Sequence, residues 1–173
     1  MAELLLQFSR STAAASTGIC WLTHSDWSHV DIVEPGVGLW GASGPDKTIK
    51  DIGGIRCRPF NPWPYRYPPK IARVQTTEDA ARQSLEWMRQ HEGAPFDNAA
   101  LYAFLKIRMG MTLHRDWRDP SQWYCAEAVI RAEELGKVFG YELVMPRNAL
   151  SPNDVLIYNN PFMSAANVKE FNS

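Results

Sequence analysis

The chain has 173 residues, of which 45% are hydrophobic and 21% charged, a composition typical of a folded domain rather than a disordered chain or a coiled coil. Its 18 Lys and Arg against 19 Asp and Glu give a formal net charge of -1. Such a balance supplies no long-range attraction to a phosphate backbone, so nucleic acid is not an expected partner. This length predicts a single domain over 1–173, with a core at about 18–155 and a C-terminal tail at about 160–173.

The first half of the chain has the pattern of short strands. Apolar or β-branched runs alternate with Gly, Pro, Asp and Ser, which predicts a small antiparallel sheet. The runs cover 18–23, 30–33, 39–42, 55–58 and 70–74. Between the last two runs, 59–69 is rich in proline and aromatic residues; because proline excludes both a helix and a central strand, we expect a loop there.

The second half predicts three helices. The first follows a threonine cap at 76 or 77, the second spans about 97–109 and is apolar on nearly all sides, and the third follows Ser121 and ends near Gly136. Together with the strands, these helices predict an α+β fold, in which a small antiparallel sheet or half-barrel packs against about three helices.

The sequence shows no signal for a membrane or for export. No run approaches the about 18 apolar residues of a membrane-spanning helix, and the segment from Met1 to Phe8 is acidic where a signal peptide is basic. We therefore expect a soluble, cytoplasmic protein. The three cysteines, Cys20, Cys57 and Cys125, are too few for a disulfide framework and fit a reducing compartment.

Cys125 is the cysteine best placed for chemistry. We expect it within the first turn of the third helix, where unpaired backbone N–H groups and the helix dipole stabilise a thiolate. The same N–H groups could bind the oxyanion that forms when the sulfur attacks a carbonyl. Cys20 and Cys57 lie inside strand-like runs and are expected to be ordinary structural residues.

A cysteine nucleophile needs a base, and the chain has four histidines. His29 opens a strand-like run, so its imidazole would be held on a rigid element. His91 falls at the end of an amphipathic helix and His114 in a charged loop, positions typical of surface residues. His24 lies in a polar loop and is a reserve candidate.

Five short motifs occur in a fixed order: Ser-His-Val-Asp-Ile-Val at 28–33, Gly-Leu-Trp-Gly-Ala-Ser at 38–43, Gly-Ile-Arg-Cys-Arg-Pro at 54–59, Pro-Phe-Asp at 95–97 and Trp-Tyr-Cys-Ala-Glu at 123–127. In order and spacing they resemble the circularly permuted branch of the NlpC-type papain-like cysteine hydrolases, the YiiX-like group. The resemblance implies a papain-like fold in which the histidine strand precedes the cysteine helix. It gives the base role to His29 and the nucleophile role to Cys125. No cofactor or metal is expected, and members of this family occur in bacteria and in phage-derived regions.

The third catalytic residue is open. The YiiX-like group often carries a Glu on the strand after the histidine, but the matching position here is near Gly41, which has no side chain. Asp31 is two residues from His29 on the same face of the strand, about 7 Å along it, so a favourable twist would let its carboxylate reach the imidazole. We take Asp31 as the orienting residue. Ser43, Asp46, a backbone carbonyl or a water are alternatives.

These features predict a cysteine peptidase or amidase that cleaves an amide or peptide bond, in cell-wall peptide or a related amide, through a thioester acyl-enzyme. Aromatic and hydroxyl side chains within or beside the motifs are expected to bind the substrate: Trp27, Ser28, Trp40, Ser43, Trp123 and Tyr124. The loop at 59–69 could form a wall of the same cleft.

Three other functions stay open at this level. Transfer of the acyl group to an acceptor other than water would make a thiol acyltransferase acting on lipid esters, as in the lecithin retinol acyltransferase-like relatives. The missing Glu near position 41 would fit a catalytically inactive papain-like binding module. Cys20, His24 and His29 could supply metal ligands, although their spacing matches no closed zinc pattern.

Overall fold

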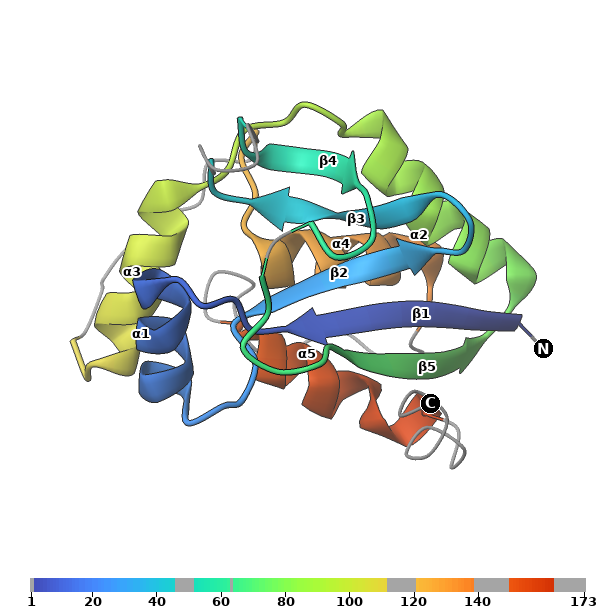
Figure 1. Ribbon diagram of the computed structural model, residues 1–173. Helices are drawn as coiled ribbons and strands as arrows, with labels where there is room; N and C mark the ends of the chain where they lie inside the picture. Colours follow the sequence, from blue (N-terminus) through green and yellow to red (C-terminus); the bar gives the residue numbers. More distant parts are fainter. Residues whose placement is uncertain (1, 46–51, 63, 112–120, 139–149, 164–173) are drawn as a thin grey trace.

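The computed structural model describes residues 2–45, 52–62, 64–111, 121–138 and 150–163. They form an α+β fold with one open, five-stranded antiparallel sheet, which confirms the predicted fold class (Figure 1). The strands lie in the order β4-β3-β2-β1-β5. Their bounds are β1 Ala2–Ser9, β2 His29–Glu34, β3 Gly38–Ser43, β4 Gly54–Arg58 and β5 Lys70–Thr76.

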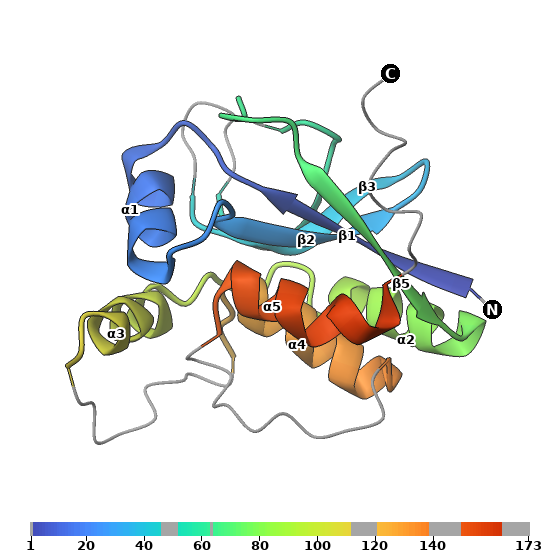
Figure 2. The same cartoon turned by 90° about the horizontal axis from the view of Figure 1, so that it is seen from below.

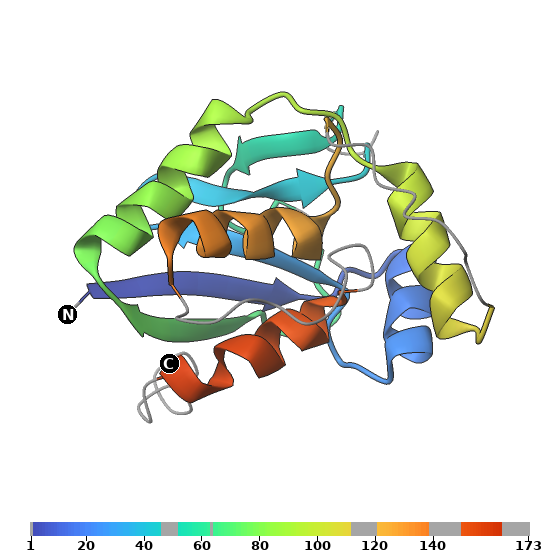
Figure 3. The ribbon, with the colours of Figure 1, turned by 180° about the vertical axis from the view of Figure 1, so that it is seen from behind.

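Five α-helices surround this sheet in the described residues. Three of them, α2, α4 and α5, cover one face, whereas α1 and α3 pack together beyond one end of the strands (Figures 2 and 3). The connection from β4 to β5 crosses the other face (Figure 2). The helices are α1 Ala14–Thr23, α2 Glu78–Gln90, α3 Asn98–Arg108, α4 Cys125–Gly136 and α5 Pro152–Asn159, and a 3-10 turn, Asn160–Phe162, follows the last of them.

The hydrophobic core lies between the sheet and the three helices on its face. Alternate side chains of β1 and β2 point toward these helices and are fully or almost fully buried. Members of this core include Leu4, Leu6, Phe8, Val30, Ile32, Val129 and Ile130. The intervening residues of β2, His29 and Asp31, therefore belong to the opposite face of the sheet.

β1 corrects the predicted start of the core. It lies in the sheet between β2 and β5, where Phe8 stands opposite Val30 on one side and Lys70 on the other. The core thus begins with β1 rather than at about residue 18. The apolar run in β1 is made of good helix formers, so its strand conformation depends on two partners that come later in the chain.

Two helices also differ from the sequence-based expectation. Residues 18–23, predicted as a strand, form the second half of α1, and α5 lies where no element was predicted. The second predicted helix is present as α3 but is not enclosed on all sides, since Tyr102 is 60% exposed. It packs against α1 at the edge of the molecule instead of within the core.

The three predicted helices begin and end close to the capping and terminating residues from which they were predicted. The Thr77 side chain accepts a hydrogen bond from the Ala80 amide at 3.1 Å and caps α2, and the Asp97 carboxylate caps α3 by accepting from the Ala100 amide at 2.7 Å. α4 ends at Gly136, as predicted. None of the helices within the described ranges is long and apolar enough to cross a membrane.

Candidate active site

Cys125 is the first residue of α4 and is 8% exposed. The first intrahelical hydrogen bond runs from the Ala128 amide to the Tyr124 carbonyl at 2.9 Å, so the amides of the preceding residues belong to the open first turn. The Tyr124 hydroxyl donates to the Leu150 carbonyl at 2.9 Å, which fixes the backbone just before the sulfur. Cys125 therefore sits where the helix dipole favours negative charge.

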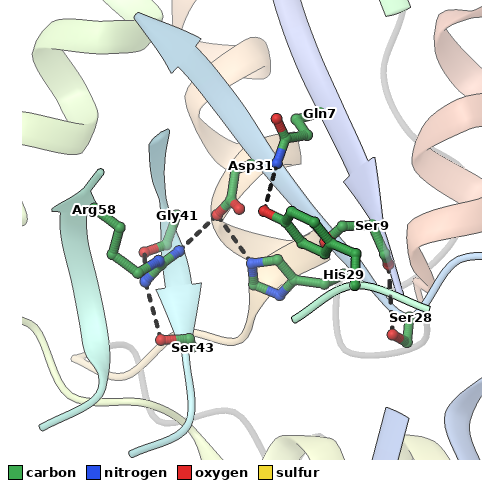
Figure 4. Close-up of polar contacts among 9 residues, drawn as sticks. Gln7, Ser9, Ser28, His29, Asp31, Gly41, Ser43 and Arg58 are labelled. Atoms are coloured by element: carbon green, nitrogen blue, oxygen red, sulfur yellow. Dashed lines mark hydrogen bonds and ion pairs between the residues drawn. The ribbon is translucent and has the colours of Figure 1, made fainter. Parts of the chain in front are cut away.

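His29 is the first residue of β2, which begins at the end of the sheet nearest α1 (Figure 1), and its ring points toward Asp31 (Figure 4). Its ring Nε2 is 2.9 Å from Asp31 Oδ1, and the imidazole also forms a hydrogen bond with the Cys125 side chain. The structure thus brings together the three residues predicted to be catalytic. The favourable twist that would let Asp31 reach His29 is present.

Asp31 also contacts a residue that the sequence did not single out. Its Oδ1 accepts a hydrogen bond from Arg58 Nη2 at 2.6 Å, and Arg58 Nη1 donates to Ser43 Oγ at 2.9 Å and to the Gly41 carbonyl at 3.3 Å (Figure 4). Asp31 is fully buried and Arg58 is 4% exposed. This is a buried ion pair in direct contact with the imidazole.

Gly41 explains how the carboxylate fits. A Cβ atom at this position would lie 2.1 Å from Asp31 Oδ1, so any other residue would collide with the carboxylate. The space that a side chain on this strand would fill is taken by Asp31 from the neighbouring strand. The absence of the expected Glu near position 41 therefore does not leave the imidazole without an acidic partner.

Burial and the neighbouring charges shift the pKa of both His29 and Asp31. Burial alone would lower the pKa of His29, but the Asp31 carboxylate and the contact with Cys125 raise it to about 9. Burial alone would raise the pKa of Asp31, but the positive charges of His29 and Arg58 hold it below its ordinary value. At neutral pH the pair is therefore an imidazolium and a carboxylate.

A cavity of about 530 Å³ opens beside the sulfur and the imidazole. Within the described lining, His29 and Cys125 are its only ionisable side chains, and the remainder are small, apolar, hydroxyl or amide groups. These residues are Ser11, Ala13, Ala15, Ser16, Ile19, Ser28, Ser43, Gly44, Pro45, Phe96, Asn98 and Leu101. The cavity therefore lies between the end of the sheet, α1 and α3.

Two of the six predicted substrate-binding residues, Ser28 and Ser43, line this cavity. The other four, which are aromatic, do not belong to its lining. Trp40 Nε1 donates to Glu34 at 2.7 Å, and the Trp123 and Trp87 rings form a T-shaped contact with centroids 5.0 Å apart. Trp27 packs against the core, and Tyr124 is buried with its hydroxyl on the Leu150 carbonyl. These aromatic side chains are placed to support the fold around the site.

The described residues of the loop at 59–69 do not line the cavity either. The Arg66 amide donates to the Arg10 carbonyl at 2.8 Å, and the Tyr65 hydroxyl accepts a hydrogen bond from Gln7 at 2.9 Å. Burial and the charge of Asp31 raise the pKa of Tyr65 to about 12. The loop thus covers the Asp31 side of the site rather than the substrate side.

The other cysteines and histidines form no second site in the described part of the chain. No group of three His, Cys, Asp or Glu side chains is placed there to hold a metal ion, so Cys20, His24 and His29 do not assemble one. Burial raises the pKa of both Cys20 and Cys57. His114 and Asp46 lie outside the described residues.

No protein-family model matches the sequence, and a search of curated proteins finds no significant relative. The chemistry of the site is therefore inferred from its own residues.

Proposed function

We propose that the protein is a papain-like cysteine hydrolase that cleaves an amide or peptide bond through a thioester acyl-enzyme. The observation that carries this proposal is one imidazole, His29, in contact with the Cys125 side chain and with the Asp31 carboxylate. A nucleophile, a base and a group that orients the base are the parts that nucleophilic acyl transfer needs. The resemblance of the five sequence motifs to the permuted NlpC-type hydrolases supports the same chemistry.

The first half of the reaction forms the acyl-enzyme. With Nε2 bonded to Asp31, Nδ1 is the ring nitrogen left to exchange a proton with the sulfur. The proton that Cys125 has given up rests on His29 as an imidazolium, and the thiolate forms a bond to the substrate carbonyl carbon while an electron pair of the carbonyl bond moves onto the oxygen. Amides of the first turn of α4 stabilise that oxyanion. The carbon–nitrogen bond then breaks, and His29 gives its proton to the leaving amine.

The second half releases the acid. A water molecule attacks the thioester carbon while His29 accepts one of its protons. The carbon–sulfur bond breaks, the acid leaves, and the proton stays on His29, which restores the imidazolium beside the Cys125 thiolate. Asp31 stays ionised throughout and holds the imidazole in the same orientation for both halves.

The lining of the cavity favours a substrate whose acyl portion is uncharged. Apart from the two reacting groups, its described lining offers hydroxyl and amide groups for hydrogen bonds and small or apolar side chains for contact, without a counter-ion. We retain cell-wall peptide or a related amide as the proposed substrate class. The same lining favours a second candidate, a thiol acyltransferase acting on lipid esters, in which another acceptor replaces water.

Alkylation of the three cysteines by iodoacetamide, followed by peptide mass spectrometry between pH 5 and 8, tests the proposal. We expect Cys125 to react fastest at pH 6, because the neighbouring imidazolium stabilises its thiolate. Cys20 and Cys57 are internal references, since burial raises the pKa of both. His29→Ala should slow Cys125 alkylation at pH 6, because the variant lacks the imidazolium that stabilises the thiolate. An unchanged profile in His29→Ala would refute the proposal, and so would a Cys125 that reacts no faster than Cys57.

A second measurement follows the acyl-enzyme itself. With p-nitrophenyl acetate as the probe, the wild type should show a burst of nitrophenol and a mass increase on the peptide that holds Cys125. Cys125→Ala should abolish both and change the free energy of unfolding by less than about 1 kcal/mol, since it removes a single sulfur atom that borders the cavity. Turnover by folded Cys125→Ala would show that another group is the nucleophile.

A further inference from the structure

Arg58 reaches the site from β4, a strand at the edge of the sheet. It is the last residue of β4, two strands away from β2, and its guanidinium extends across Gly41 to Asp31 (Figure 4). One of its terminal nitrogens bonds Asp31, and the other bonds Ser43 and the Gly41 carbonyl. A guanidinium held at both nitrogens has a fixed direction, unlike a lysine ammonium.

The Asp31 carboxylate depends on that direction. Its Oδ1 accepts from both Arg58 and His29, whereas Oδ2 has no hydrogen-bond partner among the described residues. Gly41 leaves the space in which the carboxylate lies, but it has no side chain that could fix the rotation of that carboxylate. Among the described residues, His29 and Arg58 donate the hydrogen bonds that set the rotation of Asp31.

We propose that Arg58 is a positioning residue for the reaction: it holds the Asp31 carboxylate over Gly41 in the orientation from which Asp31 binds His29 Nε2. Arg58 does not belong to the described lining of the cavity, and we assign its effect on the reaction to Asp31. Ser43 lines the substrate cavity and also bonds Arg58, so this arrangement joins the cavity wall to the carboxylate. The proposal rests on the proposed function, because it assigns Arg58 a task in that chemistry.

The test compares iodoacetamide alkylation of Cys125 against pH in the wild type, Arg58→Met and Arg58→Lys. In Arg58→Met, we expect the rate at pH 6 to fall about 10- to 100-fold, the range for misplacement of a catalytic group. The acid limb of the profile should move to higher pH, because Asp31 loses a cation that keeps its pKa low. Arg58→Lys should restore the acid limb and part of the rate, since an ammonium supplies the charge without the fork.

A double-variant comparison shows whether Arg58 acts through Asp31. Asp31→Asn should lower the alkylation rate by itself, and adding Arg58→Met should change it less than about twofold, because the two residues form one unit. This pair also removes both buried charges together, so it keeps the test available if Arg58→Met alone fails to fold. Losses that multiply instead would overturn the proposal.

The matched control is Arg56→Met, because Arg56 lies on the same strand and bonds the Gly53 carbonyl at 2.9 Å. We expect it to leave the alkylation profile of Cys125 unchanged. Proton NMR adds a geometric measurement: a downfield Nε2–H signal of His29 should be present in the wild type and lost in Arg58→Met. If His29→Ala changes the alkylation profile of Cys125 but folded Arg58→Met has the wild-type profile, the role of Arg58 is refuted and the proposed function stands. If His29→Ala has no effect, the proposed function fails first.

Discussion

At the scale of single residues, a carboxylate and a glycine on neighbouring strands share one volume. Asp31 fills the space above Gly41 and contacts two cationic groups through a single oxygen. In the YiiX-like pattern, that strand position is where a Glu is expected. An acidic group can therefore meet an imidazole from a different backbone position, provided that the opposing residue has no side chain.

Gly41→Ala tests this shared volume. The added methyl group would lie 2.1 Å from Asp31 Oδ1, so the carboxylate must move away from His29. We expect a loss of about 1–3 kcal/mol in the free energy of unfolding, as for other overpacked sites, and slower alkylation of Cys125. Urea denaturation and the iodoacetamide rate measure the two effects.

Gly18→Ala is the control for that substitution. Gly18 lies inside α1 and has open space around it, so alanine should stabilise the protein by up to about 1 kcal/mol and leave Cys125 reactivity unchanged. A Gly41→Ala protein as stable and reactive as the wild type would show that the two strands can separate at this point without cost.

The sequence predicted part of this arrangement. Residues at i and i+2 on a strand share a face, so Asp31 could be assigned to His29 from spacing alone. Arg58 could not be assigned, because its approach depends on the register of β3 with β4, which a single sequence does not specify. The aromatic residues were expected at the cavity because they lie within or beside the motifs and aromatic side chains often line clefts, but large rings are equally suited to the core.

At the scale of elements, α4 and α5 are joined by a buried polar contact. Glu133 in α4 accepts a hydrogen bond from Asn159 Nδ2 in α5 at 3.2 Å, and both side chains are fully buried. Burial raises the pKa of Glu133 to about 8, although the hydrogen bond opposes this shift. Glu133 Oε1 and Asn159 Oδ1 have no partner among the described residues. The contact is therefore most stable when Glu133 is protonated.

Glu133→Gln should stabilise the protein in a pH-dependent way. The pKa of Glu133 is raised in the folded state from 4.5 to about 8, so the wild type loses stability as the pH rises between these values. Glutamine stays neutral, and we expect a gain of roughly 1–4 kcal/mol at pH 8 and almost none at pH 4.5. Urea denaturation at both values measures it.

Glu134→Gln provides the comparison, because Glu134 is partly exposed and pairs with Arg131 at 3.4 Å. It should change stability by no more than about 0.5 kcal/mol at either pH. A Glu133→Gln protein that is equally or less stable at pH 8 would mean that the glutamate is not neutral in the folded state.

The elements that the sequence missed have identifiable reasons. The segment of α1 that was expected as a strand contains β-branched and aromatic residues, which favour strands, but it continues a helix that begins at Ala14 and packs against α3. α5 had a readable signal: Ser151 and Asp154 form a capping box around Pro152, which is a common helix start. The helices α2, α3 and α4 were predictable because their caps and apolar spacing agree.

At the scale of the whole molecule, two buried groups make stability fall as the pH rises. His29 has a folded-state pKa of about 9 against an ordinary 6.5, so its contribution is complete below 6.5 and is lost as the pH rises through 9. Glu133 acts in the same direction between 4.5 and about 8. The pKa of Asp31 is lowered, so its contribution is lost only in acid, as the pH falls from 3.8.

We therefore expect the free energy of unfolding to be greatest in mildly acidic solution and to decrease steadily from pH 6 to pH 9. Urea denaturation across this range measures the slope, which should be shallower in Glu133→Gln because one of the two contributions is removed. A flat or rising curve between pH 6 and 9 would contradict the charge states assigned to both groups.

The sulfur and the ring that would activate it are carried by separate layers, one at the start of α4 and one at the start of β2. The imidazole, the Asp31 carboxylate and the Arg58 guanidinium, by contrast, come from the meander of β2, β3 and β4. A slight sliding of the helical layer would part Cys125 from His29 while leaving the acid, its cation and the strands intact. Low concentrations of denaturant should therefore lower the reactivity of Cys125 well before the chain unfolds. The reactivity of the thiol would then report how the helical layer is aligned with the sheet rather than whether the protein is folded.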